Sequence, residues 1–175
     1  MSRVPGRCWL SPRVVVRLSS IEGFGLFATA TIAEGEAVGT LGGRIIDDAE
    51  LREIARTRPK YNSAAIDEGI SVLLRDDEPI ARGNHSCDSN LWMRDASTLE
   101  ARRDIKTGDE ITIDYSLQTS LEDWAMGCHC GSPDCRAVVR GCDWKRPDVQ
   151  ERYRGHFSPF LNRRIEAMRD KRRSS

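Results

Sequence analysis

Three cysteines in the last third of the chain have the spacing of a metal site. Cys128, Cys130 and Cys135 lie in the stretch Cys-His-Cys-Gly-Ser-Pro-Asp-Cys, where a glycine and a proline favour a tight turn. Zinc fits three convergent thiolates best, because it prefers tetrahedral thiolate coordination in structural sites and has no redox chemistry. The stretch therefore predicts a zinc-bound loop, and it leaves one of the four ligands to come from elsewhere in the chain.

The missing zinc ligand has four candidates in the sequence: His129, Cys142, Cys8 and Cys87. Spacing alone does not choose among them. His129 lies between two ligands, where neighbouring side chains rarely bend onto the same metal, and Cys142 is a fair local option. Cys87 is favoured because residues 84–90, Asn-His-Ser-Cys-Asp-Ser-Asn, resist both helix and strand and are typical of a loop held by tertiary contacts. The alternative for Cys87 is a buried free thiol.

Short strands and turns are expected to position these residues. The chain has 14 glycines against 7 prolines and several short apolar runs, which favours turns and strands over a helical bundle. Strands are expected at residues 12–18, 36–41, 63–66, 70–74, 91–94, 98–102 and 110–115. A glycine-punctuated turn is expected within residues 23–29, and Asp67-Glu68-Gly69 is expected to join two of the strands.

Helices are expected mainly in the second half of the chain. They are predicted at residues 47–58, in a short segment that opens at 120, at 146–155 and at 158–173. Asp47 and Glu50 form a capping box for the first helix, and Ser120 is a capping residue for the second. Pro147 and Pro159 stand where first-turn prolines should. The predicted order is a β-rich core, then the metal loop, then a helical tail.

The overall composition is that of an ordinary globular protein. The 175 residues fit one catalytic-sized domain with additions, and 39% are hydrophobic and 31% charged. No apolar stretch approaches the roughly 18 residues of a membrane span, and the N-terminus has no hydrophobic signal region. A cytoplasmic location is therefore expected. In that reducing compartment the 6 cysteines favour metal binding over a disulfide framework.

Charge is divided unevenly along the chain. Residues 136–175 hold 12 Lys or Arg and 5 Asp or Glu, net +7, which leaves 15 basic and 22 acidic residues upstream, net −7. An acidic body attracts basic partners, so a Lys- or Arg-rich peptide is the expected partner. The basic tail is expected to be a solvated face, with contact to nucleic acid as the alternative.

Three separated segments and the cysteine trio together resemble the SET-domain lysine methyltransferases that carry a post-SET zinc segment. In chain order these segments are Glu-Gly-Phe-Gly-Leu-Phe-Ala at residues 22–28, the polar stretch at 84–90, and Gly-Asp-Glu-Ile-Thr-Ile-Asp-Tyr at 108–115. A lone Gly-x-Gly is weak evidence for this family, but its combination with the other two segments and the cysteine trio is highly specific. The resemblance covers about residues 13–136, and the aromatic-rich part after Arg140 is similar to small bacterial members of the family.

The resemblance implies an α+β, mainly β fold of several small curved sheets. In it the second and third segments thread together as a pseudoknot, and a narrow channel joins the cofactor face to the substrate face. It implies a SET domain at residues 13–116, a zinc-binding post-SET segment at 120–140 and a helical, basic extension at 141–175. In this family the cysteine of the second segment completes the zinc site, which supports Cys87. Metal binding would then contribute to folding, because it orders two distant segments.

The activity that the resemblance implies is methyl transfer from S-adenosylmethionine to the side-chain amine of a lysine in a protein. This displacement needs alignment, desolvation and a neutral amine. A free lysine has a pKa of about 10.4, so the site must favour loss of its proton. Tyr115 is placed at the channel, where a neutral phenol can accept a hydrogen bond from the amine. Tyr61 lies where the family often has an aromatic residue that lines the channel.

The same resemblance assigns five residues to the cofactor: Gly23, Phe24, Gly25, Asn84 and His85. The two glycines let the backbone approach the cofactor closely, which a Cβ would prevent. Asn84 offers both a donor and an acceptor, and His85 would contribute chiefly backbone contacts. Dinucleotide spacing of glycines and a strand-to-helix pattern are both missing, which excludes a Rossmann site.

The sequence departs from the family pattern at four positions. Arg82 and Gly83 stand where bulkier apolar residues are usual, Ser89 replaces a proline, and Ile113 replaces the Phe or Tyr two residues before the final tyrosine. A tyrosine at that position usually restrains the enzyme to one methyl group, so Ile113 predicts more than monomethylation. The departures also leave an alternative function open. The chain would then be a catalytically weak or inactive module, stabilised by zinc, that binds basic peptides or nucleic acid.

Overall fold

The computed structural model describes residues 4–119 and 121–174, and its largest sheet has eight strands. These are β1 (Trp9–Leu10), β2 (Val14–Leu18), β3 (Phe24–Ala28), β4 (Ala37–Thr40), β8 (Asn84–His85), β9 (Leu91–Met93), β10 (Thr98–Ala101) and β11 (Glu110–Ile113). Seven of them follow the order β1-β4-β10-β9-β11-β3-β2, and β8 pairs with β11. The mainly β core that the sequence predicts is therefore present.

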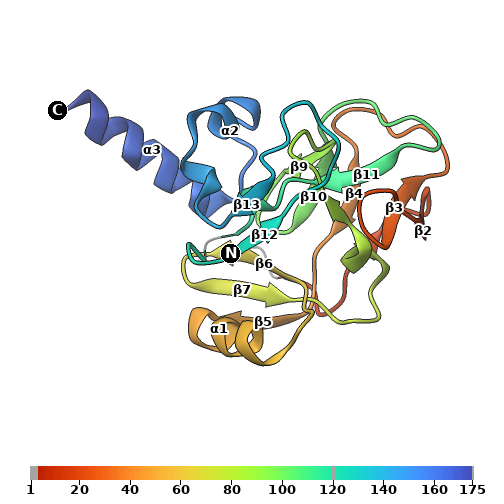
Figure 1. Ribbon diagram of the computed structural model, residues 1–175, viewed down its shortest axis with the longest axis horizontal. Helices are drawn as coiled ribbons and strands as arrows, with labels where there is room; N and C mark the ends of the chain where they lie inside the picture. Colours follow the sequence, from red (N-terminus) through yellow and green to blue (C-terminus); the bar gives the residue numbers. More distant parts are fainter. Residues whose placement is uncertain (1–3, 120, 175) are drawn as a thin grey trace.

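A smaller sheet of three strands carries the first helix. It consists of β5 (Arg44–Asp47), β6 (Ser63–Asp67) and β7 (Ile70–Leu73) in the order β5-β7-β6, and α1 (Asp48–Thr57) lies beside β5 (Figure 1). The predicted N-cap is observed, because the Asp47 side chain accepts a hydrogen bond from the backbone N–H of Glu50 at 2.8 Å, whereas the Glu50 carboxylate pairs with Arg44 instead of completing a capping box. Gly69, with φ +65°, makes the predicted turn between β6 and β7.

The cysteine-rich loop is held between two short paired strands. β12 (Ala125–Gly127) pairs with β13 (Val138–Arg140), and neither strand was predicted. The short helix expected to open at Ser120 is not formed. Ser120 itself lies outside the described residues, and the chain that follows makes a turn and then enters β12. Pairing with the distant β13 has overridden the local capping signal.

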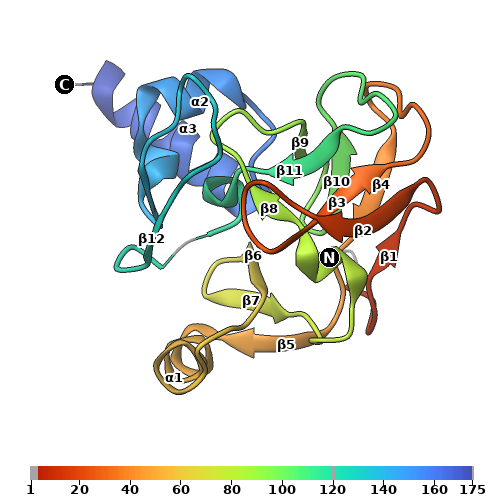
Figure 2. The ribbon, with the colours of Figure 1, turned by 45° about the vertical axis from the view of Figure 1, so that its right-hand side comes forward.

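The last third of the chain ends in two helices. α2 (Pro147–Arg152) and α3 (Pro159–Arg173) both begin at the predicted prolines. They lie together at one end of the molecule, and the C-terminal part of α3 extends away from the sheets (Figures 1 and 2). No helix in the described ranges is long and apolar enough to cross a membrane.

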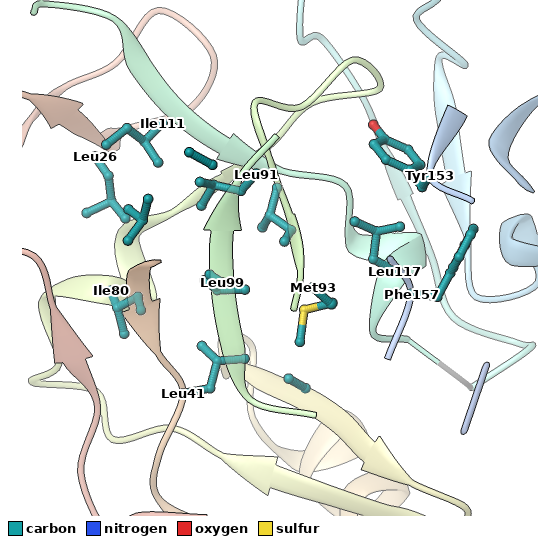
Figure 3. Close-up of a cluster of buried hydrophobic side chains, with 14 of the residues drawn as sticks. Leu26, Leu41, Ile80, Leu91, Met93, Leu99, Ile111, Leu117, Tyr153 and Phe157 are labelled. Carbon is teal, nitrogen blue, oxygen red and sulfur yellow. The ribbon is translucent and has the colours of Figure 1, made fainter. Parts of the chain in front are cut away.

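The large sheet and the helical tail share one apolar core. Figure 3 shows side chains of the sheet, such as Leu26, Leu91 and Ile111, together with Tyr153 and Phe157 of the tail. Tyr153 is 0% exposed and Phe157 is 2% exposed. The aromatic residues of the tail are therefore core residues rather than a lid, and the tail folds with the sheet.

Strand β11 brings the three sequence segments together. It pairs antiparallel with β3 and parallel with β8 and β9, so that Thr112 lies opposite Asn84 and Ile113 opposite His85. Residues 84 and 85 are thus a short strand rather than the loop expected for the whole stretch. β11 ends two residues earlier than predicted, and Tyr115 begins the 3₁₀ turn η2 (Tyr115–Leu117).

Candidate active site and metal centre

Tyr115 contacts the second sequence segment through both its backbone and its side chain. Its backbone N–H donates a hydrogen bond to His85 Nδ1 at 3.1 Å, and its hydroxyl donates one to the carbonyl of Gly83 at 2.9 Å. Burial raises the pKa of Tyr115 to about 12, so the phenol is neutral at pH 7. Because the hydroxyl donates its hydrogen bond to the Gly83 carbonyl, the phenol oxygen keeps its lone pairs to accept a hydrogen bond from another donor.

Trp124 connects the regions of Tyr115 and Tyr61. The centre of its ring lies 6.3 Å from that of Tyr115, and Trp124 packs against the same apolar cluster as Tyr61. Burial, together with the charge of Asp123, raises the pKa of Tyr61. All three aromatic side chains are partly buried. Trp124 was missed by sequence reasoning, although its place just before the cysteine-rich loop is a signal that points to it.

The side-chain amide of Asn84 is held by the first sequence segment. Its Nδ2 donates to the carbonyls of Glu22 and Phe24, both at 3.2 Å, to Ser19 Oγ at 3.0 Å and to Glu110 Oε1 at 2.8 Å. These acceptors fix the orientation of the amide. The Asn84 Oδ1 atom is then the part of the side chain left to accept hydrogen bonds from a ligand.

Gly25 is required by this network because a larger residue would clash with it. A Cβ at residue 25 would lie 2.2 Å from Glu110 Oε1 and 3.1 Å from Asn84 Nδ2. Gly23 has φ +45°, a conformation that other residues rarely adopt. Phe24 between them is 51% exposed. Glu110 was not singled out from the sequence, although it belongs to the third segment.

Four cysteine sulfurs meet at one point. The Sγ atoms of Cys87, Cys128, Cys130 and Cys135 all lie within 4.8 Å of one another. The distance between the Sγ atoms of Cys87 and Cys128 is 3.8 Å, which is about the 3.8 Å edge of a tetrahedron with Zn–S bonds of about 2.3 Å. Although burial raises the pKa of Cys130, hydrogen bonds from the Cys87 N–H and its other neighbours lower it to about 7. The donor set therefore fits zinc.

The other three candidates for the fourth ligand lie outside this group as far as the described residues show. The thiol of Cys8 instead contacts the backbone of Gly42, with Sγ 3.3 Å from its carbonyl oxygen. Cys142 precedes the 3₁₀ turn η3 (Asp143–Lys145), and His129 is exposed. The prediction that Cys87, rather than one of these three residues, joins the cysteine trio agrees with the structure.

Comparison with known proteins identifies the family. The SET domain matches residues 23–116 of this chain, a span that contains Asn84, Tyr115 and most of the first segment. The chain belongs to the SET domain family. Within this SET domain, β3, β8 and β11 are the strands that carry the three segments.

Two SET-domain relatives illustrate the similarity in sequence. Histone-lysine N-methyltransferase TRX1 of Oryza sativa subsp. japonica is 33% identical over 148 residues, which cover 73% of this chain and 14% of that protein. The H3 lysine-36 specific histone-lysine N-methyltransferase of Yarrowia lipolytica is 32% identical over 136 residues, which cover 69% of this chain and 17% of that protein. This chain thus corresponds to less than a fifth of these relatives. Since both are eukaryotic, the resemblance to small bacterial members stays a prediction.

The predicted SET fold is confirmed by a solved structure. The methyltransferase domain of human Histone-lysine N-methyltransferase SETMAR superimposes with a TM-score of 0.58 at 22% sequence identity. The match covers 73% of this chain and 58% of that one.

Proposed function

We propose that this chain transfers a methyl group from S-adenosylmethionine to the side-chain amine of a lysine in a protein. The observation that carries the proposal is the meeting of Tyr115 with His85 and Gly83 inside a SET fold. The printed names of the relatives, histone-lysine N-methyltransferases, support a protein lysine as the acceptor.

Tyr115 would act on the acceptor amine. Its hydroxyl donates a hydrogen bond to the Gly83 carbonyl, so the oxygen would accept a hydrogen bond from the lysine nitrogen and direct the nitrogen lone pair away from the ring. The aromatic side chains of Trp124 and Tyr61 would exclude water around the lysine stem and so favour the neutral amine. The bound cofactor would supply the methyl group to the neutral amine, and the proton that the amine loses before attack would pass to solvent.

Asn84 and the loop of Gly23, Phe24 and Gly25 would bind the cofactor. When bound, S-adenosylmethionine supplies a methyl group on a positively charged sulfur. The Asn84 amide nitrogen is committed to the loop and to Glu110, so its Oδ1 would accept a hydrogen bond from the cofactor. His85 would contribute backbone contacts, since both of its ring nitrogens face the protein.

A structural zinc ion would be held by the four clustered cysteines. Cys87 belongs to the segment after β8, while Cys128, Cys130 and Cys135 belong to the loop between β12 and β13. A zinc ion bound there would link the centre of the large sheet to the C-terminal region. Its role would be to order these two parts rather than to take part in methyl transfer.

The organisation that we propose keeps the predicted boundaries of a SET domain at 13–116, a post-SET segment at 120–140 and an extension at 141–175. A basic, lysine-containing protein segment is the proposed partner of the acidic body. Two arginines of the extension form ion pairs with acidic side chains: Arg163 pairs with Asp67 at 2.7 Å, and Arg164 pairs with Glu68. Binding of nucleic acid and a cytoplasmic location stay predictions.

The test is methyl transfer from radiolabelled S-adenosylmethionine to a protein lysate and to core histones. We expect labelled lysine with the wild-type chain and at least about a hundredfold lower rate with Tyr115→Phe, because the amine loses its acceptor. Calorimetric binding of S-adenosylmethionine should be unchanged in this variant and weakened in Asn84→Ala. Tyr153→Phe, which also removes one hydroxyl, is the matched control. Unchanged transfer by Tyr115→Phe would refute the role of Tyr115, and binding without any transfer by wild type would favour the binding-module alternative.

A further inference from the structure

Arg136 lies between the cysteine cluster and the chain around Tyr115. Its side chain is 4% exposed. On one side Nη2 donates to Asp114 Oδ1 at 2.7 Å and Nη1 pairs with Asp143 Oδ2 at 3.1 Å. On the other side its Nε and its backbone N–H both donate to Cys87 Sγ at 3.3 Å. One buried guanidinium thus contacts both the acidic residue before Tyr115 and a proposed metal ligand.

Asp114 depends on this guanidinium. Its side chain is 0% exposed, and Oδ1 also accepts hydrogen bonds from the backbone N–H and the hydroxyl of Ser116, at 3.0 and 2.7 Å. Oδ2 has no hydrogen-bond partner within the described part of the chain. A buried carboxylate without a cationic partner is strongly unfavourable, so Asp114 is held in place by Arg136. Because Asp114 and Ser116 flank Tyr115, this pair fixes the backbone on both sides of the tyrosine.

A second route leads from Cys87 to Tyr115 through His85. The Tyr115 N–H donates to His85 Nδ1 at 3.1 Å, and His85 Nε2 lies 3.3 Å from Cys87 Sγ and 3.4 Å from Arg136 Nη2. The imidazole therefore links the position of the sulfur to that of the Tyr115 backbone.

We infer that Arg136 is a positioning residue that sets the place of Tyr115 relative to the cysteine cluster. It does so by pairing with Asp114 while its Nε and backbone N–H bind Cys87. The inference rests on the proposed function, in which Tyr115 orients the amine and the cysteines bind zinc. A lysine at this position keeps the charge but offers one ammonium instead of donors on a rigid planar fork, so it cannot hold Asp114, Asp143 and Cys87 in the same geometry.

The test compares Arg136→Lys with Arg140→Lys, a change four residues along at an exposed position of β13. Both variants are expected to bind one zinc ion per chain, measured by metal analysis, and to keep the wild-type circular dichroism. In Arg136→Lys alone, kcat for transfer to core histones or a lysate acceptor should fall at least about tenfold, while the KM for S-adenosylmethionine changes less than about threefold. The thiolate-to-metal band of the cobalt-substituted chain should also shift in this variant, because a donor to Cys87 is lost.

A role of Arg136 in folding alone would lower the unfolding temperature and leave kcat and the cobalt band as in wild type, and this result would overturn the inference. A fall in kcat that only follows the fraction of metal lost would overturn it too. If the zinc-loaded wild type methylates nothing, the proposed function fails instead. The cobalt band and the Tyr115 amide resonance, which should both move in Arg136→Lys and stay in Arg140→Lys, then decide the inference without turnover.

Discussion

Replacement of Gly25 by alanine tests the network that orients Asn84. The added Cβ would lie 2.2 Å from Glu110 Oε1 and 2.9 Å from its Cδ, so the carboxylate has to move. Glu110 accepts hydrogen bonds from Ser19 Oγ at 2.8 Å and from Asn84 Nδ2 at 2.8 Å, and both break when it moves. The backbone cannot move instead, because Gly25 is paired with Arg17 in the sheet.

The expected cost follows from these two hydrogen bonds. Each hydrogen bond to a carboxylate contributes about 1.5 kcal/mol, so Gly25→Ala should lower the free energy of unfolding by about 3 kcal/mol. For a chain of this length that corresponds to a fall in Tm of about 6–12 °C, measured by circular dichroism. The affinity for S-adenosylmethionine, measured by calorimetry, should fall at least about tenfold because the Asn84 amide is no longer held.

A double substitution separates this explanation from general strain. If the clash with Glu110 is the cause, Gly25→Ala combined with Glu110→Ala should be about as stable as Glu110→Ala alone, because the obstructing carboxylate is gone. Gly6→Ala is the control, since a Cβ there meets nothing within 4 Å. Each single variant should lose about 3 kcal/mol of unfolding free energy. If these two losses simply add to about 6 kcal/mol in the double variant, the reasoning is refuted.

Three further outcomes are expected. Tyr153→Phe removes a buried hydroxyl bonded to the N–H and Oγ of Ser89, at 3.2 and 3.1 Å, and should lower the unfolding free energy in urea by about 2 kcal/mol; an unchanged midpoint would contradict this. Mass spectrometry of the product should show di- or trimethyllysine because Ile113 replaces an aromatic residue, and a purely monomethyl product would disprove that prediction. Arg163→Ala, which removes the ion pair of a 61% exposed Arg163 with Asp67, should cost less than about 1 kcal/mol, and a loss above about 2 kcal/mol would show that the pair anchors α3.

Local sequence patterns predicted the elements whose signal lies within a few residues. The Asp47 N-cap of α1, the Gly69 turn and the first-turn prolines of α2 and α3 depend on neighbouring residues alone, and all are observed. The helix predicted to open at Ser120 was wrong, because the chain after it pairs with β13 more than ten residues later.

The site residues divide in the same way. The spacing of the cysteine trio, and the resemblance of three segments to the SET family, were enough to single out Asn84, Tyr115 and the trio as chemically important. They were not enough for Glu110 and Arg136, which have no unusual local pattern. Their importance comes from what they contact across the fold, Asn84 in one case and Asp114 with Cys87 in the other.

The amino-acid sequence by itself determined that this chain carries three segments similar to those of the SET family and a thiolate loop suited to zinc, since those features are set by residue type and short spacing. Only the tertiary structure decided which thiol joins the loop and what orients Tyr115. Cys87 and Cys128 are 41 residues apart and Arg136 is 22 residues from Asp114, distances over which spacing carries no information about contact. Pairing of β8 with β11, and burial of charge beside it, bring these groups together.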